Sequence, residues 1–273
     1  GDLLPITVSV TVDGDALRAD FSETTDQIAG NINAVRAVTG SCLSYAVRVA
    51  TDPSIPATGG AHRPLELITR PGSIVDASPP VAVAAGNVET SQRIADTLLG
   101  ALAQLAPDRV PAASQGTMNN VLVGNDRFAY YETVAGGQGA RPGKDGQSGI
   151  KTGMTNTKNT PVTSIGMHFP FEVTRYRLRR GSGGNGQFRG GDGIERELLF
   201  ADHAVVSLMG ERRLTAPWGL AGGSDGLPGE DWLIRTDGSR EQLPSKCTVD
   251  VAPGDRLLVL TPGGGGWGSS AVD

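Results

Sequence analysis

The sequence predicts an α+β protein, with two main helices in its N-terminal third and a strand-rich remainder that is full of glycine turns. Apolar residues recur every three or four positions before residue 108, and in short alternating runs after residue 111. The 273 residues include 39 glycines and 17 prolines, whereas charged residues make up only 19%. That balance is typical of a folded, loop-rich chain. We expect a mixed hairpin and helix region over 1–108 and a β-rich region over 109–273.

The N-terminal region begins with two alternating segments. Apolar residues alternate over Ile6–Val12 and over Leu17–Phe21, and Asp13-Gly14 between them predicts a hairpin turn. An apolar stripe over 33–49 predicts a helix that ends before Pro53. A second stripe runs from Ile94 to Leu105, with Pro107 as its stop and Asn87 or Thr90 as the candidate N-cap.

Beyond residue 111 the helical period disappears and short strands are expected. They are centred on the apolar runs at 121–123, 128–130, 171–173, 205–208 and 257–260. Alternating Arg175, Arg177 and Arg179 lie on one side of such a strand and predict a basic face that is solvated or faces another subunit. Trp267, inside the glycine-rich C-terminal stretch, predicts a close-packed turn because so large a ring usually anchors something.

Charge and hydropathy limit the partners. The formal net charge of −5 argues against nucleic acid or an anionic membrane as the main partner. No apolar run is long enough for a membrane span, and the first residues do not look like a signal peptide. The two cysteines, Cys42 and Cys247, lack metal-site spacing and are expected to be structural thiols. A cytoplasmic protein fits these features best.

Several familiar catalytic signatures fail on their context. Gly181–Gly186 fits G-x-G-x-x-G, but the following residues cannot start the helix that a dinucleotide site needs. Gly143-Lys144 lacks the remainder of a phosphate-binding loop, and Ser114 lacks the helix of a nucleophile elbow. The S-x-x-K and K-T-G matches share Lys151, so both are accidental. The three histidines are far apart and predict no metal site.

What remains is a dense stretch of small polar residues and glycines from Ser114 to Asn159. Amides and hydroxyls bind carbonyl groups, and glycines let backbone N–H groups approach a ligand. Glu132 and Asp145 are candidate acids or bases, and Arg141 could pair with a carboxylate or phosphate. The same composition is equally typical of tight turns in a strand-rich fold. Other candidate binding residues are Ser114, Thr117, Asn119, Gly136, Gly137, Thr155, Asn156 and Asn159.

Long stretches of the sequence resemble the C-terminal half of the hydantoinase B/5-oxoprolinase family. The resemblance runs in order along essentially the whole chain and includes Gly86–Arg93, Ala113–Asn120, Tyr131–Thr133, Gly136–Arg141, Met154–Thr157, Asn159–Val162, Ser182–Gly184, Arg189–Gly191, Pro217–Leu220 and Thr261–Gly268. Thr163 and Gly166 depart from the family pattern, because many relatives have glutamates there.

The resemblance implies ATP-dependent opening of a cyclic amide such as a hydantoin, 5-oxoproline or another lactam. A hydantoinase-A-type partner with ATP and Mg would phosphorylate the carbonyl oxygen, and the B-type part would direct water to the activated carbon. This chain would then bind no cofactor itself and would be inactive alone. Relatives also have an N-terminal half with a segment that looks like a metal-binding site. We expect that half to lie on another chain or on a removed segment.

Within this reading, Asn119, Asn156 and the amides of Gly136 and Gly137 are expected to bind the carbonyl or its oxyanion. Glu132 and Asp145 would handle protons or hold those groups in place, so Glu132, Asp145 and Asn156 are the candidate catalytic residues. Ser114, Thr117, Arg141, Thr155 and Asn159 complete the expected binding site. Two alternatives are a subunit of an ATP-dependent ketone carboxylase and a non-catalytic assembly subunit.

Overall fold

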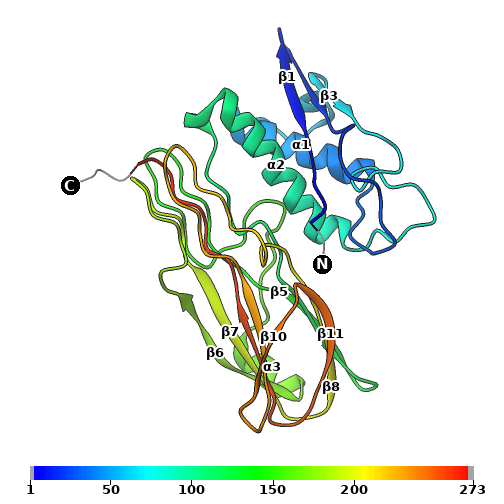
Figure 1. The fold of residues 1–273 in the computed structure, drawn as a ribbon, viewed down its shortest axis with the longest axis vertical. Coiled ribbons are helices and arrows are strands. Elements are labelled where there is room, and N and C mark those ends of the chain that lie inside the picture. The colour runs from blue at the N-terminus through cyan, green and yellow to red at the C-terminus, as the bar shows by residue number, and fades with distance from the viewer. Residues whose placement is uncertain (1–2, 270–273) are drawn as a thin grey trace. The chain divides into compact units, whose positions relative to one another are not determined.

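The computed structural model describes residues 3–269 and confirms the α+β class. Three α-helices and twelve strands in three sheets lie within these described residues (Figure 1). The chain divides into two compact units, residues 1–111 and residues 112–273. Each unit has its own buried residues, and each is described by itself below. Within residues 3–269, no helix combines the length and the apolar character that crossing a membrane would require.

The first unit contains the expected hairpin. Strands β1 (Ser9–Asp13) and β2 (Ala16–Asp20) pair antiparallel, and Gly14 between them has a φ of 57°. That backbone conformation suits glycine because it has no Cβ. A third strand, β3 (Leu65–Ile68), adds to β2 in parallel and completes a small sheet.

Both expected helices are confirmed as α1 (Arg36–Ala50) and α2 (Ser91–Leu105). They pack against each other, and the Cys42 thiol donates to the main-chain oxygen of Ser91. The predicted cap of α2 is wrong. A π-helical turn, η2 (Gly86–Thr90), continues directly into α2, so Thr90 is already helical and no side chain caps the helix. The Thr90 hydroxyl instead donates to the main-chain oxygen of Ile32.

The second unit is a sandwich of two antiparallel sheets. One sheet has the order β10-β9-β12-β7-β6, and the other has the order β11-β8-β4-β5. Both draw on strands far apart in the sequence, so non-local pairing dominates this unit. The strands are β4 (Asn120–Gly124), β5 (Ala129–Thr133), β6 (Phe171–Arg179), β7 (Gly193–Phe200), β8 (Ala204–Met209), β9 (Glu230–Ile234), β10 (Arg240–Leu243), β11 (Lys246–Val251) and β12 (Arg256–Leu260).

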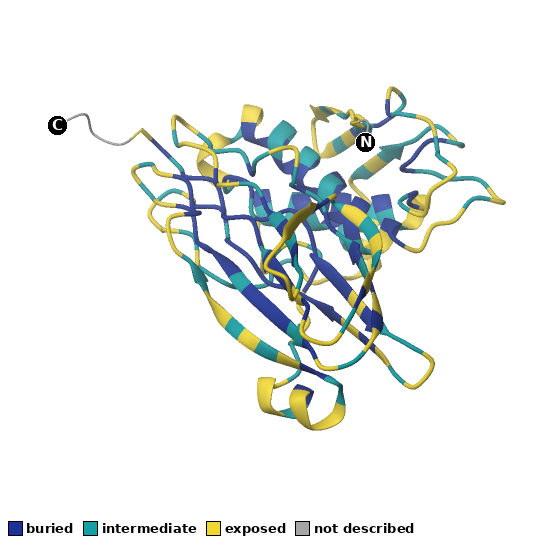
Figure 2. Cartoon of the chain, turned by 60° about the horizontal axis from the view of Figure 1, so that its bottom comes forward, coloured by how far each residue is buried: buried dark blue, intermediate teal, exposed yellow. Residues whose placement is uncertain are grey.

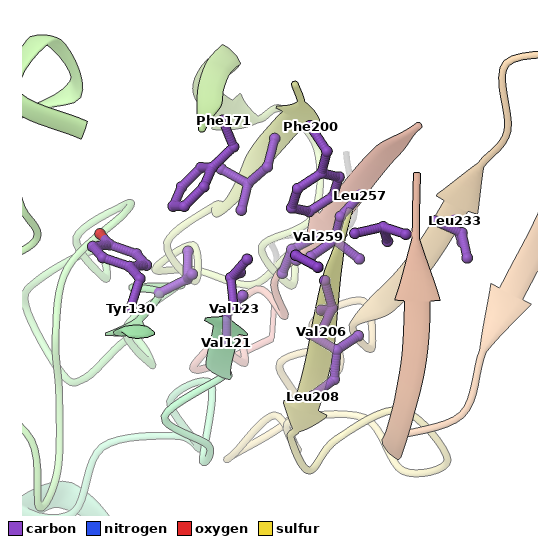
Figure 3. Packing of buried hydrophobic residues seen from close by; sticks show 14 of the residues in the cluster. Val121, Val123, Tyr130, Phe171, Phe200, Val206, Leu208, Leu233, Leu257 and Val259 are labelled. Carbon is purple, nitrogen blue, oxygen red and sulfur yellow. The ribbon is translucent and has the colours of Figure 1, made fainter. Parts of the chain in front are cut away.

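Side chains from both sheets form one hydrophobic core (Figure 3). Val121, Val123 and Val206 extend from the four-stranded sheet, and Leu257 and Val259 from the five-stranded sheet. Along β8, buried residues alternate with partly or fully exposed ones, as expected for a sheet with one face against a core. In β12 three consecutive residues are buried. Figure 2 colours the chain by this burial. A group of aromatic rings closes one end of the core, comprising Phe128, Tyr130, Phe169, Phe171 and Phe200.

Glycine-rich extended segments form a separate, tightly packed layer in the second unit. Backbone hydrogen bonds link Gly137 to Pro262, Gly264 to Gly191, and Ala140 to Gly265. A Cβ on Gly137 would lie 2.0 Å from the carbonyl oxygen of Gly191, so the backbones approach too closely for any side chain. The expected anchoring role of Trp267 is confirmed, because its ring packs 6.1 Å from that of Phe188 and its backbone bridges to the same residue.

Two expectations for the second unit are corrected. A third helix, α3 (Val162–His168), follows Pro161 where only strands were expected. The arginines of β6 do not form an unneutralised basic face. Arg175 and Arg177 pair with Glu195, and Arg179 pairs with Glu230. Because each guanidinium pairs with a carboxylate from another strand of the same sheet, β7 or β9, the face carries mixed charge.

Candidate functional site

A cavity of about 340 Å³ lies in the second unit, beside the end of β5 and the start of α3. This volume falls within the range of small-molecule pockets. We call it the Lys151 pocket. Its walls come from the loop between β5 and α3 and from β6, and its lining consists of Ala135, Gly149, Lys151, Thr157, Lys158, Asn159, Thr160, Pro161, Val162 and Tyr176.

Hydrogen bonds to Thr133 hold three lining residues in place. The Lys151 ammonium donates to both the main-chain oxygen and the hydroxyl of Thr133. The Asn159 amide donates to the same main-chain oxygen at 2.8 Å. The Thr133 hydroxyl also shares a 2.7 Å hydrogen bond with the hydroxyl of Thr157. One buried residue at the end of β5 therefore positions three side chains of the pocket wall.

Behind this wall lies a buried ion pair between Glu132 and Arg196. Arg196 Nε donates to Glu132 Oε1 at 2.6 Å, and Nη2 donates to Oε2 at 2.9 Å. Both side chains are almost fully buried. Tyr130 and Asn159 also donate to Oε2, at 3.0 and 2.9 Å. Glu132 is thus a carboxylate with four donors, arranged to hold Asn159 rather than to reach the cavity, whose lining does not include it.

Lys151 is unusual because its charge is only partly compensated. Burial lowers the pKa of its ammonium to about 8, and the nearby Arg196 guanidinium adds to that effect. Glu132 acts in the opposite direction but is outweighed. A lysine with this pKa exchanges its proton near neutral pH, and it supplies a positive charge or a base in a partly dry environment.

Asn119 lies outside the Lys151 pocket, in a buried polar network. Its amide nitrogen donates to Gln115 Oε1 at 2.8 Å and to the main-chain oxygen of Val134 at 3.0 Å. Its Oδ1 accepts from Arg213 at 2.5 Å, and Arg213 in turn pairs with Asp231 at 2.9 Å. Every polar atom of the Asn119 side chain is therefore engaged within the protein.

The amides of Gly136 and Gly137 also have partners inside the protein. Gly136 N–H donates to Ile150 at 3.2 Å, and Gly137 N–H donates to Pro262 at 3.0 Å. A bound oxyanion would have to displace these carbonyl groups. Both glycines do allow a close approach, as expected, but the atoms that approach them belong to the protein and not to a ligand.

The remaining predicted residues are spread over turns. The hydroxyls of Ser114 and Thr117 accept backbone N–H groups, from Gly139 at 3.1 Å and from Asn119 at 3.1 Å. Asp145 accepts the N–H of Arg189 at 2.8 Å. Three further predicted residues are not among those that line the Lys151 pocket. Asn156 and Arg141 are exposed, while Thr155 is buried and its hydroxyl has no hydrogen-bond partner among the described residues.

Neither Lys151 of the pocket nor Arg196 of the ion pair behind it is predicted as a site residue from the sequence. Lys151 was set aside with an accidental motif, and Arg196 gave no signal beyond a charged residue in an apolar strand. An arginine flanked by Ile194 and Leu198 on a buried strand does indicate a buried partner, since arginine is almost never fully buried unless paired. Among residues 3–269, no group of three or more His, Cys, Asp or Glu side chains is placed to hold a metal ion.

Comparison with known proteins places this fold in a family. The hydantoinase B/oxoprolinase family model matches residues 1–270. The chain is 41% identical over 270 residues to 5-oxoprolinase 1 of Arabidopsis thaliana, covering 99% of this chain and 21% of that protein. It is 37% identical over 265 residues to the 5-oxoprolinase of Dictyostelium discoideum, covering 96% and 20%. The chain therefore spans about a fifth of these relatives.

Solved structures agree with this relationship. The ATP-dependent caprolactamase from Pseudomonas jessenii superimposes with a TM-score of 0.86 at 25% identity, covering 97% of this chain and 48% of that one. An acetone carboxylase, whose sequence is only 18% identical, shares the fold with a TM-score of 0.82 over 96% and 41% of the two chains. On the family match and the identities together, the chain belongs to the hydantoinase B/oxoprolinase family.

Proposed function

We propose that the chain is the B-type component of an ATP-dependent hydrolase that opens a cyclic amide. The observation that carries the proposal is 41% identity to a 5-oxoprolinase over almost the whole chain. Structural similarity to an ATP-dependent caprolactamase also supports the proposal. Both relatives are named for a lactam, and an amide in a small ring is the bond that the two substrates share.

In the proposed division of work, an A-type ATPase partner transfers the γ-phosphoryl group of ATP to the carbonyl oxygen. That transfer makes the carbonyl carbon electrophilic. Water then adds to this carbon, the ring C–N bond breaks and the phosphoryl group leaves as inorganic phosphate, so that the products are ADP, phosphate and the ring-opened amino acid. In the part of the chain that the structure describes, Gly181–Gly186 is not followed by the helix that a dinucleotide motif requires. We assign ATP and Mg to the partner. The chain is then inactive alone, and the N-terminal half of B-type relatives belongs to the working enzyme.

Within this chain we place substrate contacts at the Lys151 pocket. Asn159 is oriented by Glu132 and Thr133, so Glu132 acts as a positioning residue through it. Asn156 and Asp145 remain proposed participants. Asp145→Asn keeps an acceptor for the Arg189 N–H but removes the charge, and it should abolish ring opening in the assembled enzyme. Retained turnover would count against a chemical role for Asp145.

A substrate panel tests the function. The chain is co-expressed with an A-type ATPase subunit and the N-terminal half of a B-type subunit, and ADP release is measured with 5-oxoproline, hydantoin or caprolactam. We expect lactam-dependent ADP release with the ring-opened amino acid as product. ADP release that requires a ketone and bicarbonate, and no lactam, would instead indicate a carboxylase. No turnover with either class would favour a non-catalytic assembly role.

A further inference from the structure

We propose that the Lys151 pocket binds the anionic oxygen of a small ring compound through Lys151 and an N–H group of the same ligand through Asn159. This inference deepens the proposed function, on which it rests for the ligand class. It assigns the chain a cyclic amide that carries a carboxylate, or that has acquired a phosphoryl group on its carbonyl oxygen.

The side chains that line the pocket carry positive charge. Its described lining includes two lysines, Lys151 and Lys158, and no carboxylate. The carboxylate behind the wall belongs to Glu132, which is matched by Arg196 at two points. That pair is neutral as a unit, so the positive charge of the two lysines is not cancelled within the pocket. An anion is the ligand that this field favours.

The hydrogen-bonding groups of the pocket define the ligand further. The Lys151 ammonium has three hydrogens, and Thr133 accepts two of them, which leaves one N–H for a ligand. The Asn159 amide donates twice, to Glu132 and to Thr133, so its NH₂ group is used and its carbonyl oxygen remains as an acceptor. One donor with a positive charge and one neutral acceptor match an oxyanion and an amide N–H.

The environment of Lys151 does not look like an arrangement selected for stability. Burial disfavours its charge, and Glu132, the carboxylate that favours that charge, is paired with Arg196. A methionine of similar length could fill the same space without that cost. Charged groups that are kept in unfavourable surroundings beside a cavity are typical of binding and catalytic sites.

Tyr176 supplies an apolar surface for a ring. The Arg196 guanidinium carbon lies 4.7 Å from the centre of the Tyr176 ring, which holds the aromatic plane against the buried ion pair. The tyrosine lines the pocket, as do Pro161 and Val162. A five- or six-membered ring fits a 340 Å³ cavity whose lining has both charged and apolar side chains.

Calorimetric titration of the purified chain tests the assignment without requiring turnover. The probes are 5-oxoproline, 2-pyrrolidinone (the same ring without the carboxylate) and inorganic phosphate. The variants are Lys151→Met and Lys151→Arg, with Lys144→Met as a matched control on an exposed turn outside the pocket. Thermal melting of each variant establishes that it is folded.

We expect the wild-type chain to bind 5-oxoproline roughly tenfold or more tightly than 2-pyrrolidinone, from one charge-assisted hydrogen bond. Lys151→Met should abolish that preference, Lys151→Arg should retain part of it, and Lys144→Met should leave it intact. Lys151-dependent binding of phosphate alone would assign the pocket to the phosphoryl group. Binding of both anions that survives Lys151→Met, or no anion binding to the wild type, would overturn the proposal. Because no catalysis is needed, an enzyme that opens no lactam would not affect this result.

Discussion

Glu132 and Arg196, 64 residues apart in the sequence, form a two-point ion pair that links the two sheets of the second unit. Glu132 lies on β5 of the four-stranded sheet, and Arg196 lies on β7 of the five-stranded sheet. The pair also anchors the Asn159 side chain of the Lys151 pocket. The fold and the candidate site therefore share one element, and changes to it should be visible in both.

Removing one member of this pair should be costly. Arg196→Met leaves the Glu132 carboxylate buried without its counter-charge, and we expect it to lower the free energy of unfolding by about 3–5 kcal/mol. Urea denaturation followed by circular dichroism measures the change. Arg177→Met is the control, because Arg177 also pairs with a glutamate but its side chain is 65% exposed, and it should cost less than about 1 kcal/mol. Equal effects of the two substitutions would contradict the assigned importance of burial.

The double substitution Glu132→Leu with Arg196→Met should recover much of that loss, because it leaves no uncompensated charge. The same variant should still lose affinity for pocket ligands, since Asn159 loses one of its two anchors. Stability and ligand binding measured on the same preparation separate the two roles. A double variant as unstable as Arg196→Met would indicate that packing, and not charge, dominates at this position.

Lys151→Met should stabilise the folded chain, and the gain should depend on pH. The pKa of Lys151 falls from its usual 10.5 to about 8 on folding, so between these values the unfolded chain binds more protons than the folded chain. The free energy of unfolding of the wild type therefore rises with pH over that window. The advantage of the variant should be largest below pH 8 and vanish towards pH 10.5.

Thermal melting of both proteins from pH 6.5 to pH 10 measures this difference. Glu132 and Arg196 act on the ammonium, and Lys158 and Tyr176 line the same pocket. All four are present in both proteins, so the comparison isolates the change at Lys151. A difference in melting temperature that is constant across the range would show that Lys151 does not titrate in this window.

Gly137→Ala should disrupt the glycine layer. The added Cβ would lie 2.0 Å from the Gly191 oxygen and 2.3 Å from the Gly264 nitrogen, and both are backbone atoms that cannot rotate away. We expect a loss of about 3 kcal/mol or more in the free energy of unfolding. Gly166→Ala is the control in α3, where the nearest atom is 3.9 Å away and alanine favours the helix. A tolerated Gly137→Ala would show that the layer is loosely packed.

The sequence anticipates those parts of the fold whose signals are local. The hairpin at Gly14, both long helices and the strand-rich second unit follow from periodicity and turn residues. Helix α3 is not predicted from the sequence because it contains Gly166 and has only seven residues, too few to establish a period. The start of α2 is predicted wrongly because a π-helical turn precedes the helix, and such turns have no distinctive local pattern.

The candidate site is harder to anticipate because it depends on contacts between distant residues. Glu132 and Asn159 stand out in the sequence as polar residues, and the structure does bring them together. Neighbours that are far away in the sequence decide whether a polar residue binds a ligand or its own chain. Asn119, for example, is bound by Arg213. The partly compensated charge of Lys151 depends on Glu132 and Arg196, and no local sequence motif indicates that arrangement.

The most direct test of the proposed function is the coupling of ATP hydrolysis to ring opening in the assembled enzyme. ADP and the ring-opened product are measured together, with this chain present, omitted or carrying Lys151→Met. We predict equal amounts of ADP and product that require the chain, and a marked loss of coupled turnover with Lys151→Met when 5-oxoproline is the substrate. Undiminished ring opening without the chain, or ATPase activity of the purified chain alone, would contradict the proposed division of work.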